Sequence, residues 1–325
     1  MSLPLHSTEK EDFLEQYIQS LLRGNGEELS AYLTQVDTHQ QVFETKAVTR
    51  CYMVSSDGQH LPRIDDLALR IAFFLLDYAV PRSEIDKAKL LDEQQNTTIH
   101  TVQLKRKAKK LFTELKKTGE GGELLLYLLI QSVLRLPQAL SKMSLKTSGQ
   151  LHYQGADAIH LGYDKPTQKL SLYWGEAKLY QSIDSAINEC FKSLSPYLIG
   201  QNGINDARER DLQLLMTNID LANPDLENAI LNYLDPNHPS FNSLEYRGAC
   251  LIGYNVDSYC SEPFAKEQSI VLNEITQSFT NWLSKLNTGI KKHNHLDKFS
   301  LDVFLVPFPS VQAFRDSFLE AIKDV

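Results

Sequence analysis

The stretch that decides the fold is DAIHLGYDKPTQKLSLYWGEAKLY, residues 157–180. Two runs rich in apolar and aromatic residues are separated by Gly162–Gln168, a segment with turn-forming Gly, Asp and Pro residues. The pattern predicts two strands, Leu151–Leu161 and Lys169–Lys178, joined as a hairpin whose centre lies between Pro166 and Thr167.

The centre of this hairpin determines which residues face one another. Equal steps outward pair Ile159 with Trp174 and Asp157 with Glu176. Side chains alternate between the faces of a strand, so Lys178, two residues beyond Glu176, shares its face. The same alternation places His152 and His160 on the opposite face. We therefore expect two carboxylates with Cβ atoms roughly 5 Å apart and an amine beside them.

Two carboxylates this close repel each other and need a positive charge nearby. Lys178 can supply part of it, and a divalent cation with oxygen ligands can supply more. Such a cation can bind a phosphate, acidify a water molecule and stabilise the phosphoryl oxygens. Lys178 could orient or deprotonate that water, or neutralise the transition state. On spacing alone, a structural cross-strand salt bridge explains Asp157, Glu176 and Lys178 equally well.

The helix before the hairpin offers a third carboxylate. Glu123 stands at the edge of the apolar run Leu124–Ile130 and is expected to lie near the sheet. The alternative is that Glu123 is a first-turn acid that complements the helix dipole. The whole helix is predicted to span Glu120–Leu136 and, being apolar on most sides, to be buried.

The remaining sequence predicts an α/β protein with a mixed central sheet flanked by helices. We expect a mainly helical N-terminal region, residues 1–117, and a core formed by residues 118–325. The expected elements are helices at Glu11–Leu22, Leu67–Tyr78, Ser182–Leu194, Phe264–Lys291 and Ser310–Lys323, and strands at Val48–Val54, Leu212–Ile219, Ala249–Val256 and Ser300–Val306, the last ended by Pro307.

Composition points to a soluble cytoplasmic protein. Four cysteines without C-x-x-C spacing argue against a disulfide framework and fit a reducing compartment. No secretory signal pattern opens the sequence, and Leu124–Ile130, the longest apolar run, is far shorter than the about 20 residues that span a bilayer. We therefore expect no membrane association.

Charge bears on nucleic-acid binding. A net charge of −8 argues against a protein that coats nucleic acid unaided. The most basic stretch, Lys105–Lys117, has apolar residues at helical spacing. It is either the solvated face of an amphipathic helix or a phosphate-contacting face, for which the candidates are Lys105, Arg106, Lys109 and Lys110.

The residues around the hairpin resemble the PD-(D/E)xK nuclease superfamily. The resemblance rests on Gly155-Ala156-Asp157 and Tyr173–Tyr180, which follow the helix that begins Gly119-Glu120-Gly121-Gly122-Glu123. More narrowly, these segments and the C-terminal Phe304–Val311 are similar to HamA, the nuclease subunits of the Hachiman anti-phage defence system. The similarity is most specific over residues 119–198 and from Ser300 onward. Ala156 departs from the superfamily pattern, in which proline often precedes the aspartate.

The resemblance implies a restriction-endonuclease-like core in which Asp157 and Glu176 bind Mg²⁺ or Mn²⁺. It further implies that Lys178 assists attack on a DNA phosphodiester, with Glu123 and the backbone carbonyl of Ala177 as additional candidate metal ligands. The implied partners are DNA and a superfamily-2 helicase, HamB.

These observations lead to one principal hypothesis and two competitors. The principal one is a metal-dependent deoxyribonuclease whose DNA is delivered by its helicase partner. The second is a non-catalytic interaction subunit whose nuclease-like fold docks on the helicase. The third is a glycosidase with a cross-strand carboxylate pair, because a retaining enzyme needs carboxylates at about that separation. The lysine two residues beyond Glu176 counts against the third.

Overall fold

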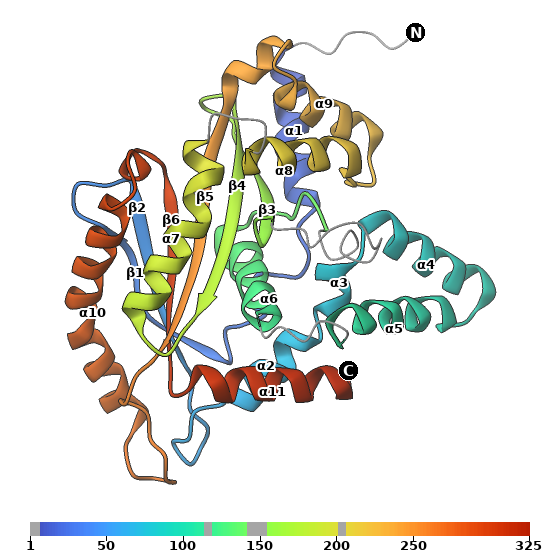
Figure 1. Cartoon of the computed structure of the whole chain (residues 1–325). Coiled ribbons are helices and arrows are strands. Elements are labelled where there is room, and N and C mark those ends of the chain that lie inside the picture. Colours follow the sequence, from blue (N-terminus) through green and yellow to red (C-terminus); the bar gives the residue numbers. More distant parts are fainter. Residues whose placement is uncertain (1–6, 114–118, 142–154, 201–205) are drawn as a thin grey trace, which may run out of the picture.

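The computed structural model describes residues 7–113, 119–141, 155–200 and 206–325. Figure 1 shows a central sheet with helices on both sides and the C-terminus at the end of α11. The strands are β1 (Leu33–Gln41), β2 (Ala47–Val54), β3 (Ala158–Asp164), β4 (Lys169–Leu179), β5 (Leu244–Asn255) and β6 (Leu301–Phe308). The α-helices are α1 (Ser7–Ser20), α2 (Ile64–Ala72), α3 (Leu75–Ala79), α4 (Arg82–Gln95), α5 (Ile99–Thr113), α6 (Glu120–Leu129), α7 (Ile183–Ile199), α8 (Ala207–Asn218), α9 (Pro224–Leu234), α10 (Gln268–Lys291) and α11 (Val311–Asp324).

The six strands form one mixed sheet in the order β1-β2-β6-β5-β4-β3. The four central strands are parallel, whereas β1 and β3 pair antiparallel with their neighbours at the two edges. The predicted fold class, an α/β protein with a mixed sheet flanked by helices, is confirmed. Two strands of this sheet, β1 and β2, come from the first 117 residues; the division of the chain at residue 117 stays a prediction.

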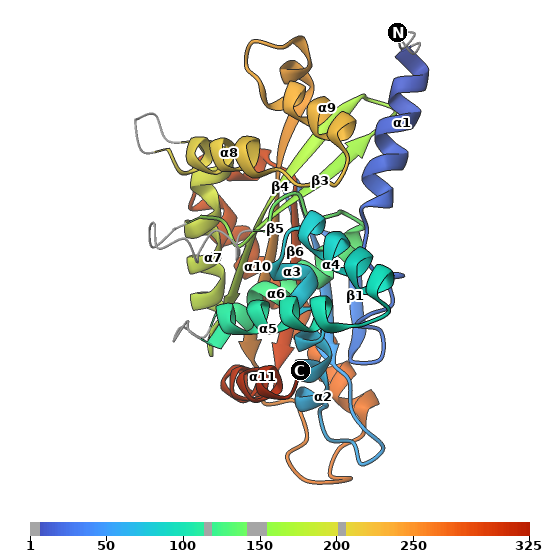
Figure 2. The ribbon, with the colours of Figure 1, turned by 90° about the vertical axis from the view of Figure 1, so that its right-hand side faces the viewer.

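Helices cover both faces of the sheet (Figures 1 and 2). On one face, Trp174 of β4 stacks on Tyr197 of α7 at 5.3 Å, and Tyr254 of β5 meets Trp282 of α10 at 5.0 Å. On the other face lie α6, α2 and α11. The helices α4 and α5 form an antiparallel pair that projects from the body of the molecule. No helix in the described part of the chain is long and apolar enough to cross a bilayer.

The helix α6 is buried against the sheet, as its apolar sequence predicts. Every residue from Leu124 to Ile130 is at most 3% exposed. Its two glycines allow a close approach, because a Cβ on Gly121 would lie 2.9 Å from the Phe318 ring of α11 and one on Gly122 would lie 2.6 Å from Leu179 of β4. The helix continues as a π-helical turn, Ile130–Leu134, before Pro137. The glycines therefore hold α6 over the end of β4.

The hairpin forms in the predicted register. Ile159 pairs with Trp174 and Leu161 with Leu172, and the turn lies at residues 165–168. The first strand begins at Ala158, later than expected, and residues 151–154 lie outside the described part. The strands Ala249–Val256 and Val48–Val54 are likewise present as β5 and β2.

One predicted element was wrong, and the end of one predicted helix was misplaced. Leu212–Ile219 is not a strand but belongs to α8, where Leu212 and Leu215 are buried one turn apart and Asp206 caps the helix by accepting a hydrogen bond from the Arg208 N–H. The helix α7 does not stop before Pro196 but continues to Ile199. The Ser195 hydroxyl lies 3.5 Å from the Lys192 carbonyl that loses its partner at Pro196.

One strand boundary and one whole strand were also missed. The strand β6 runs through Pro307 because β2 accompanies it only as far as Leu305, and the Pro307 carbonyl accepts a hydrogen bond from Tyr259. The edge strand β1 was not predicted, since its sequence LTQVDTHQQ is largely polar.

His160 lies on the face of β3 opposite to Asp157, as predicted, and points toward Tyr127 of α6 at 5.9 Å; His152 lies outside the described residues. The ring is fully buried, and its Nδ1 lies 2.8 Å from the Leu136 carbonyl, to which it donates. Burial lowers the pKa of His160 from 6.5 to about 4, partly opposed by this hydrogen bond. His160 is therefore a neutral structural residue at physiological pH.

We expect a His160→Asn variant to lose part of the acid sensitivity of the protein. A folded-state pKa below the unfolded one gives stability that is complete above pH 6.5 and is lost as the pH falls toward 4. Asparagine keeps a donor for the Leu136 carbonyl but cannot take up the proton. Between pH 7 and pH 4, the free energy of unfolding measured in urea should fall by about 3 kcal/mol more for the wild-type protein than for the variant. A constant difference would contradict this assignment.

Candidate active site

Asp157 lies at the point where β3 begins beside β4. Its N–H donates to the Gly175 carbonyl at 2.9 Å, and its carboxylate Oδ2 accepts from the Ala177 N–H at 2.9 Å. The observed hairpin register, carried one residue further, places Asp157 opposite Glu176. Within an extended strand the N–H and C=O of one residue point to the same side. The Ala177 carbonyl is therefore directed to the side of β4 on which Asp157 lies.

Glu176 and Lys178 share the face of β4 that is covered by α7. The Lys178 ammonium forms an ion pair with Glu176 Oε1, and the Glu176 side chain is 5% exposed against 22% for Lys178. From α7, the Cys190 thiol donates to the Glu176 carbonyl at 3.6 Å. The lysine therefore reaches solvent while the carboxylate it contacts is nearly enclosed.

The third predicted carboxylate, Glu123 in the first turn of α6, is linked to Asp157 by Tyr78. The Tyr78 hydroxyl donates to Glu123 Oε2 at 3.0 Å and lies 3.3 Å from the Asp157 backbone carbonyl. Tyr78 is 2% exposed and comes from α3, in the N-terminal part of the chain. The sequence predicted a helix at Leu67–Tyr78, but no motif marked the role of this hydroxyl.

The acidic groups of the candidate site carry more negative charge than Lys178 neutralises. The pKa of Asp157 is raised well above its usual value by burial and by the nearby Glu176 and Glu123, and Lys178 and the Ala177 N–H only partly offset this. Burial lowers the pKa of Lys178, but the charges of Asp157 and Glu176 outweigh it, so that the net pKa is raised and the lysine is cationic. Asp157 therefore lies near two other acids, and the Lys178 amine lies near Asp157 and Glu176.

A hard divalent cation fits this donor set. Asp157 and Glu176 offer carboxylate oxygens, and a cation between them would remove the repulsion that raises the pKa of Asp157. In the described residues, no three His, Cys, Asp or Glu side chains are gathered closely enough to hold a metal by themselves. Two carboxylates suit Mg²⁺, which keeps several waters and binds through one or two such groups.

We expect a Tyr78→Phe substitution to destabilise the protein by about 2 kcal/mol. The change removes a buried hydrogen bond to a carboxylate and leaves Glu123 Oε2 and the Asp157 carbonyl without this donor. Urea unfolding measures the loss, with Tyr17→Phe, a change at an exposed tyrosine, as the control. Unchanged stability would show that the Tyr78 hydroxyl does not hold Glu123 in place.

The predicted basic residues lie on α5. Arg106 and Lys110 are exposed, Lys105 lies 5.8 Å from the Phe73 ring, and Lys109 donates to the Lys323 carbonyl at 2.5 Å. Residues 114–117 of the basic stretch lie outside the described part. Lys109 therefore ties α5 to the end of α11, and Arg106 and Lys110 lie on the exposed surface of α5.

The comparisons with known proteins identify the family of the chain. A search of curated proteins yields no match. A protein-family model described as HamA matches residues 30–322, a range that includes Glu123, Asp157, Glu176 and Lys178 together with all six strands of the sheet. Because the match covers nearly the whole chain, the chain belongs to the HamA family of Hachiman anti-phage defence proteins.

Proposed function

We propose that the chain is a metal-dependent deoxyribonuclease with a restriction-endonuclease-like PD-(D/E)xK core, acting as the effector subunit of a Hachiman complex. One observation carries the proposal. The hairpin register brings Asp157 beside Glu176, with Lys178 on the same face of β4. Membership of the HamA family supports the assignment to anti-phage defence.

The side chains divide the chemistry between them. Asp157 and Glu176 would hold Mg²⁺ or Mn²⁺, with the Ala177 carbonyl as a further ligand, whereas Glu123 does not lie close enough to both to complete a three-carboxylate site. When bound, the cation would act as a Lewis acid on the phosphate and lower the pKa of water. Lys178 is kept cationic by the two acids, and its charge would stabilise the phosphate as it becomes more negative during attack.

The negative charge of the chain suggests that a partner subunit provides most of the DNA binding. A net charge of −8 opposes strong binding to DNA by this chain alone. We infer that the helicase partner, HamB, delivers the DNA and that the exposed Arg106 and Lys110 of α5 contact its phosphates. This inference predicts weak DNA binding by the isolated chain and salt-sensitive binding by the complex.

A non-catalytic docking subunit is the competing function. The nearly enclosed Glu176 carboxylate and its ion pair with Lys178 are also what a structural salt bridge would show. The glycosidase hypothesis is not retained, because membership of the HamA family assigns the chain to anti-phage defence.

Cleavage of plasmid DNA separates the two functions. The wild-type protein, alone and with its helicase partner, is incubated with plasmid DNA and either Mg²⁺, Mn²⁺ or EDTA. A Glu176→Ala/Lys178→Ala double variant is tested under the same conditions. A Glu189→Ala/Lys192→Ala variant removes an exposed ion pair of α7 and is the matched control. The nuclease proposal requires metal-dependent cleavage that only the first variant loses. Cleavage that survives both EDTA and the double substitution would refute it, and an inactive wild-type protein that binds the helicase would favour docking.

A further inference from the structure

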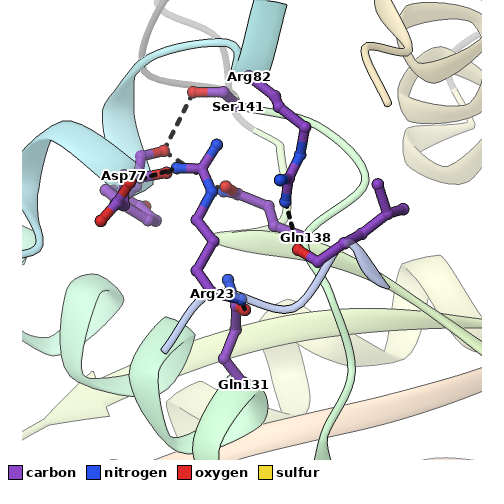
Figure 3. Close-up of polar contacts among 8 residues, drawn as sticks. Arg23, Asp77, Arg82, Gln131, Gln138 and Ser141 are labelled. Carbon is purple, nitrogen blue, oxygen red and sulfur yellow. Dashed lines mark hydrogen bonds and ion pairs between the residues drawn. The ribbon is translucent and has the colours of Figure 1, made fainter. Parts of the chain in front are cut away.

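A second polar site lies apart from the acids of β3 and β4. It is a cavity of about 400 Å³ at the start of α4, lined by side chains that come from distant parts of the chain. Figure 3 shows Arg23, from the loop after α1, and Arg82, from the first turn of α4, with their guanidinium groups close together. Gln131, Gln138 and Ser141 complete this side of the cavity. Its volume falls in the range of small-molecule sites.

The two arginines carry more positive charge than this wall neutralises. Arg23 pairs with Asp77 at 2.9 Å and also donates to the Asp77 carbonyl at 2.5 Å. Arg82 donates to a neutral group, the Leu21 carbonyl. Burial lowers the pKa of Arg82, and the charge of Arg23 lowers it further, against a smaller opposing effect of Asp86. An anion in the cavity would relieve this repulsion.

The start of α4 adds donors suited to an anion. The first N–H groups of a helix have no partner within the helix and carry partial positive charge. One of them, the Ser83 N–H, already binds a carboxylate oxygen of Asp220 at 2.9 Å, and the Ser83 hydroxyl binds the same oxygen at 2.8 Å. This end of the cavity therefore stabilises negatively charged oxygen.

The remaining wall of the cavity is acidic, and this limits which ligand it can bind. Glu84, Asp220 and Glu227 also line the cavity. Glu84 pairs with Lys107 at 3.1 Å, and Glu227 accepts from the Leu221 N–H at 2.9 Å. Each of these contacts uses one oxygen of its carboxylate, so the second oxygen is the one that could accept a hydrogen bond from a ligand. A molecule with a phosphate at one end and N–H donors at the other, as in a nucleotide base, matches both walls.

We propose that this cavity binds a nucleoside 5′-monophosphate group, either as a free nucleotide or as the phosphorylated 5′ end of a DNA strand. Arg23 and Arg82 would contact the phosphate, and the carboxylates would accept hydrogen bonds from the base. Binding is measured without cleavage, so failure of this proposal and failure of the proposed nuclease function are distinguishable.

Tyr78 connects the cavity to the acids of the candidate active site. Its backbone carbonyl accepts hydrogen bonds from the Ser141 hydroxyl at 3.0 Å and the Gln138 amide at 3.4 Å, both in the cavity wall. Its hydroxyl donates to Glu123 beside Asp157. A nucleotide in the cavity would therefore contact the wall that positions Tyr78.

Calorimetric titration tests the proposal with deoxyadenosine 5′-monophosphate, deoxyadenosine and inorganic phosphate. We expect the monophosphate to bind more tightly than either fragment, and Arg82→Gln to weaken its binding by about tenfold or more, since a charge-assisted contact is lost. Arg82→Lys, which keeps the charge, should weaken it less. Arg70→Gln removes an arginine that donates to the Glu28 carbonyl outside the cavity and should bind as wild type does.

Competition distinguishes the two sources of the phosphate. An Asp157→Asn protein is used, so that no cleavage interferes, with a short oligonucleotide bearing a 5′-phosphate or a 5′-hydroxyl. Displacement of the mononucleotide by the phosphorylated strand alone assigns the cavity to a DNA end; no displacement assigns it to a free nucleotide. The proposal is overturned if deoxyadenosine or inorganic phosphate binds as tightly as the monophosphate, if no binding occurs, or if folded Arg82→Gln and Arg82→Lys both bind normally.

Discussion

Replacing Lys178 with methionine is expected to lower DNA cleavage by about 10²–10³-fold while Mn²⁺ binding persists. Methionine keeps most of the length of the side chain but removes the charge that lies against Glu176 Oε1. That charge would stabilise negative oxygen during attack on the phosphodiester. Lys178 is not one of the proposed metal ligands. Its replacement should therefore lower the rate of cleavage without changing the affinity for the cation.

The matched control is Lys169→Met on the same strand. Lys169 pairs with Glu245 at 2.6 Å and is 43% exposed, so that its loss removes an ion pair of β4 far along the strand from Lys178. Cleavage by this variant should match the wild-type rate. A Lys178→Met protein that cleaves normally, or one that no longer binds Mn²⁺, would contradict the role assigned to the lysine.

Replacing Asp157 with asparagine is expected to abolish metal binding and lower cleavage by about 10³-fold or more. Asp157 lies opposite Glu176, and without it the site keeps a single carboxylate on this face of the hairpin. Asparagine can still accept the hydrogen bond from the Ala177 N–H, so the backbone contact that starts β3 is preserved. Mn²⁺ titration followed by cleavage assays measures both effects.

In the absence of metal, the same substitution is expected to raise the free energy of unfolding at alkaline pH. Burial, Glu176 and Glu123 raise the pKa of Asp157 above its usual value. The folded protein therefore holds a proton that the unfolded chain releases, and wild-type stability falls as the pH rises from about 4 toward the folded-state pKa. In EDTA, Asp157→Asn should be more stable than wild type at pH 8 and should lose this advantage near pH 4. A variant less stable than wild type at pH 8 would contradict the excess of negative charge.

Much of the hairpin was predictable because its information is local. The turn-forming residues around Pro166 set the centre, the two-residue period of a strand sets the faces, and the pairing of Ile159 with Trp174 follows. The burial of α6 was predictable for the same reason, since its apolar residues occupy nearly every side. Prediction from local patterns failed where a strand and a helix fit the same pattern of apolar residues. The apolar residues of 212–219 suit a short strand as well as a helix, and packing of Leu212 and Leu215 decided for α8.

By itself, the sequence determined that Asp157, Glu176 and Lys178 would share one face of a hairpin, because alternation along paired strands leaves no other arrangement in that register. Only the tertiary structure decided what surrounds them. Glu123 reaches this end of the sheet because Gly121 and Gly122 let α6 pack between Phe318 and Leu179, and a tyrosine 79 residues from Asp157 joins the two acids. Such contacts depend on how separate elements pack, which no pattern within one segment specifies.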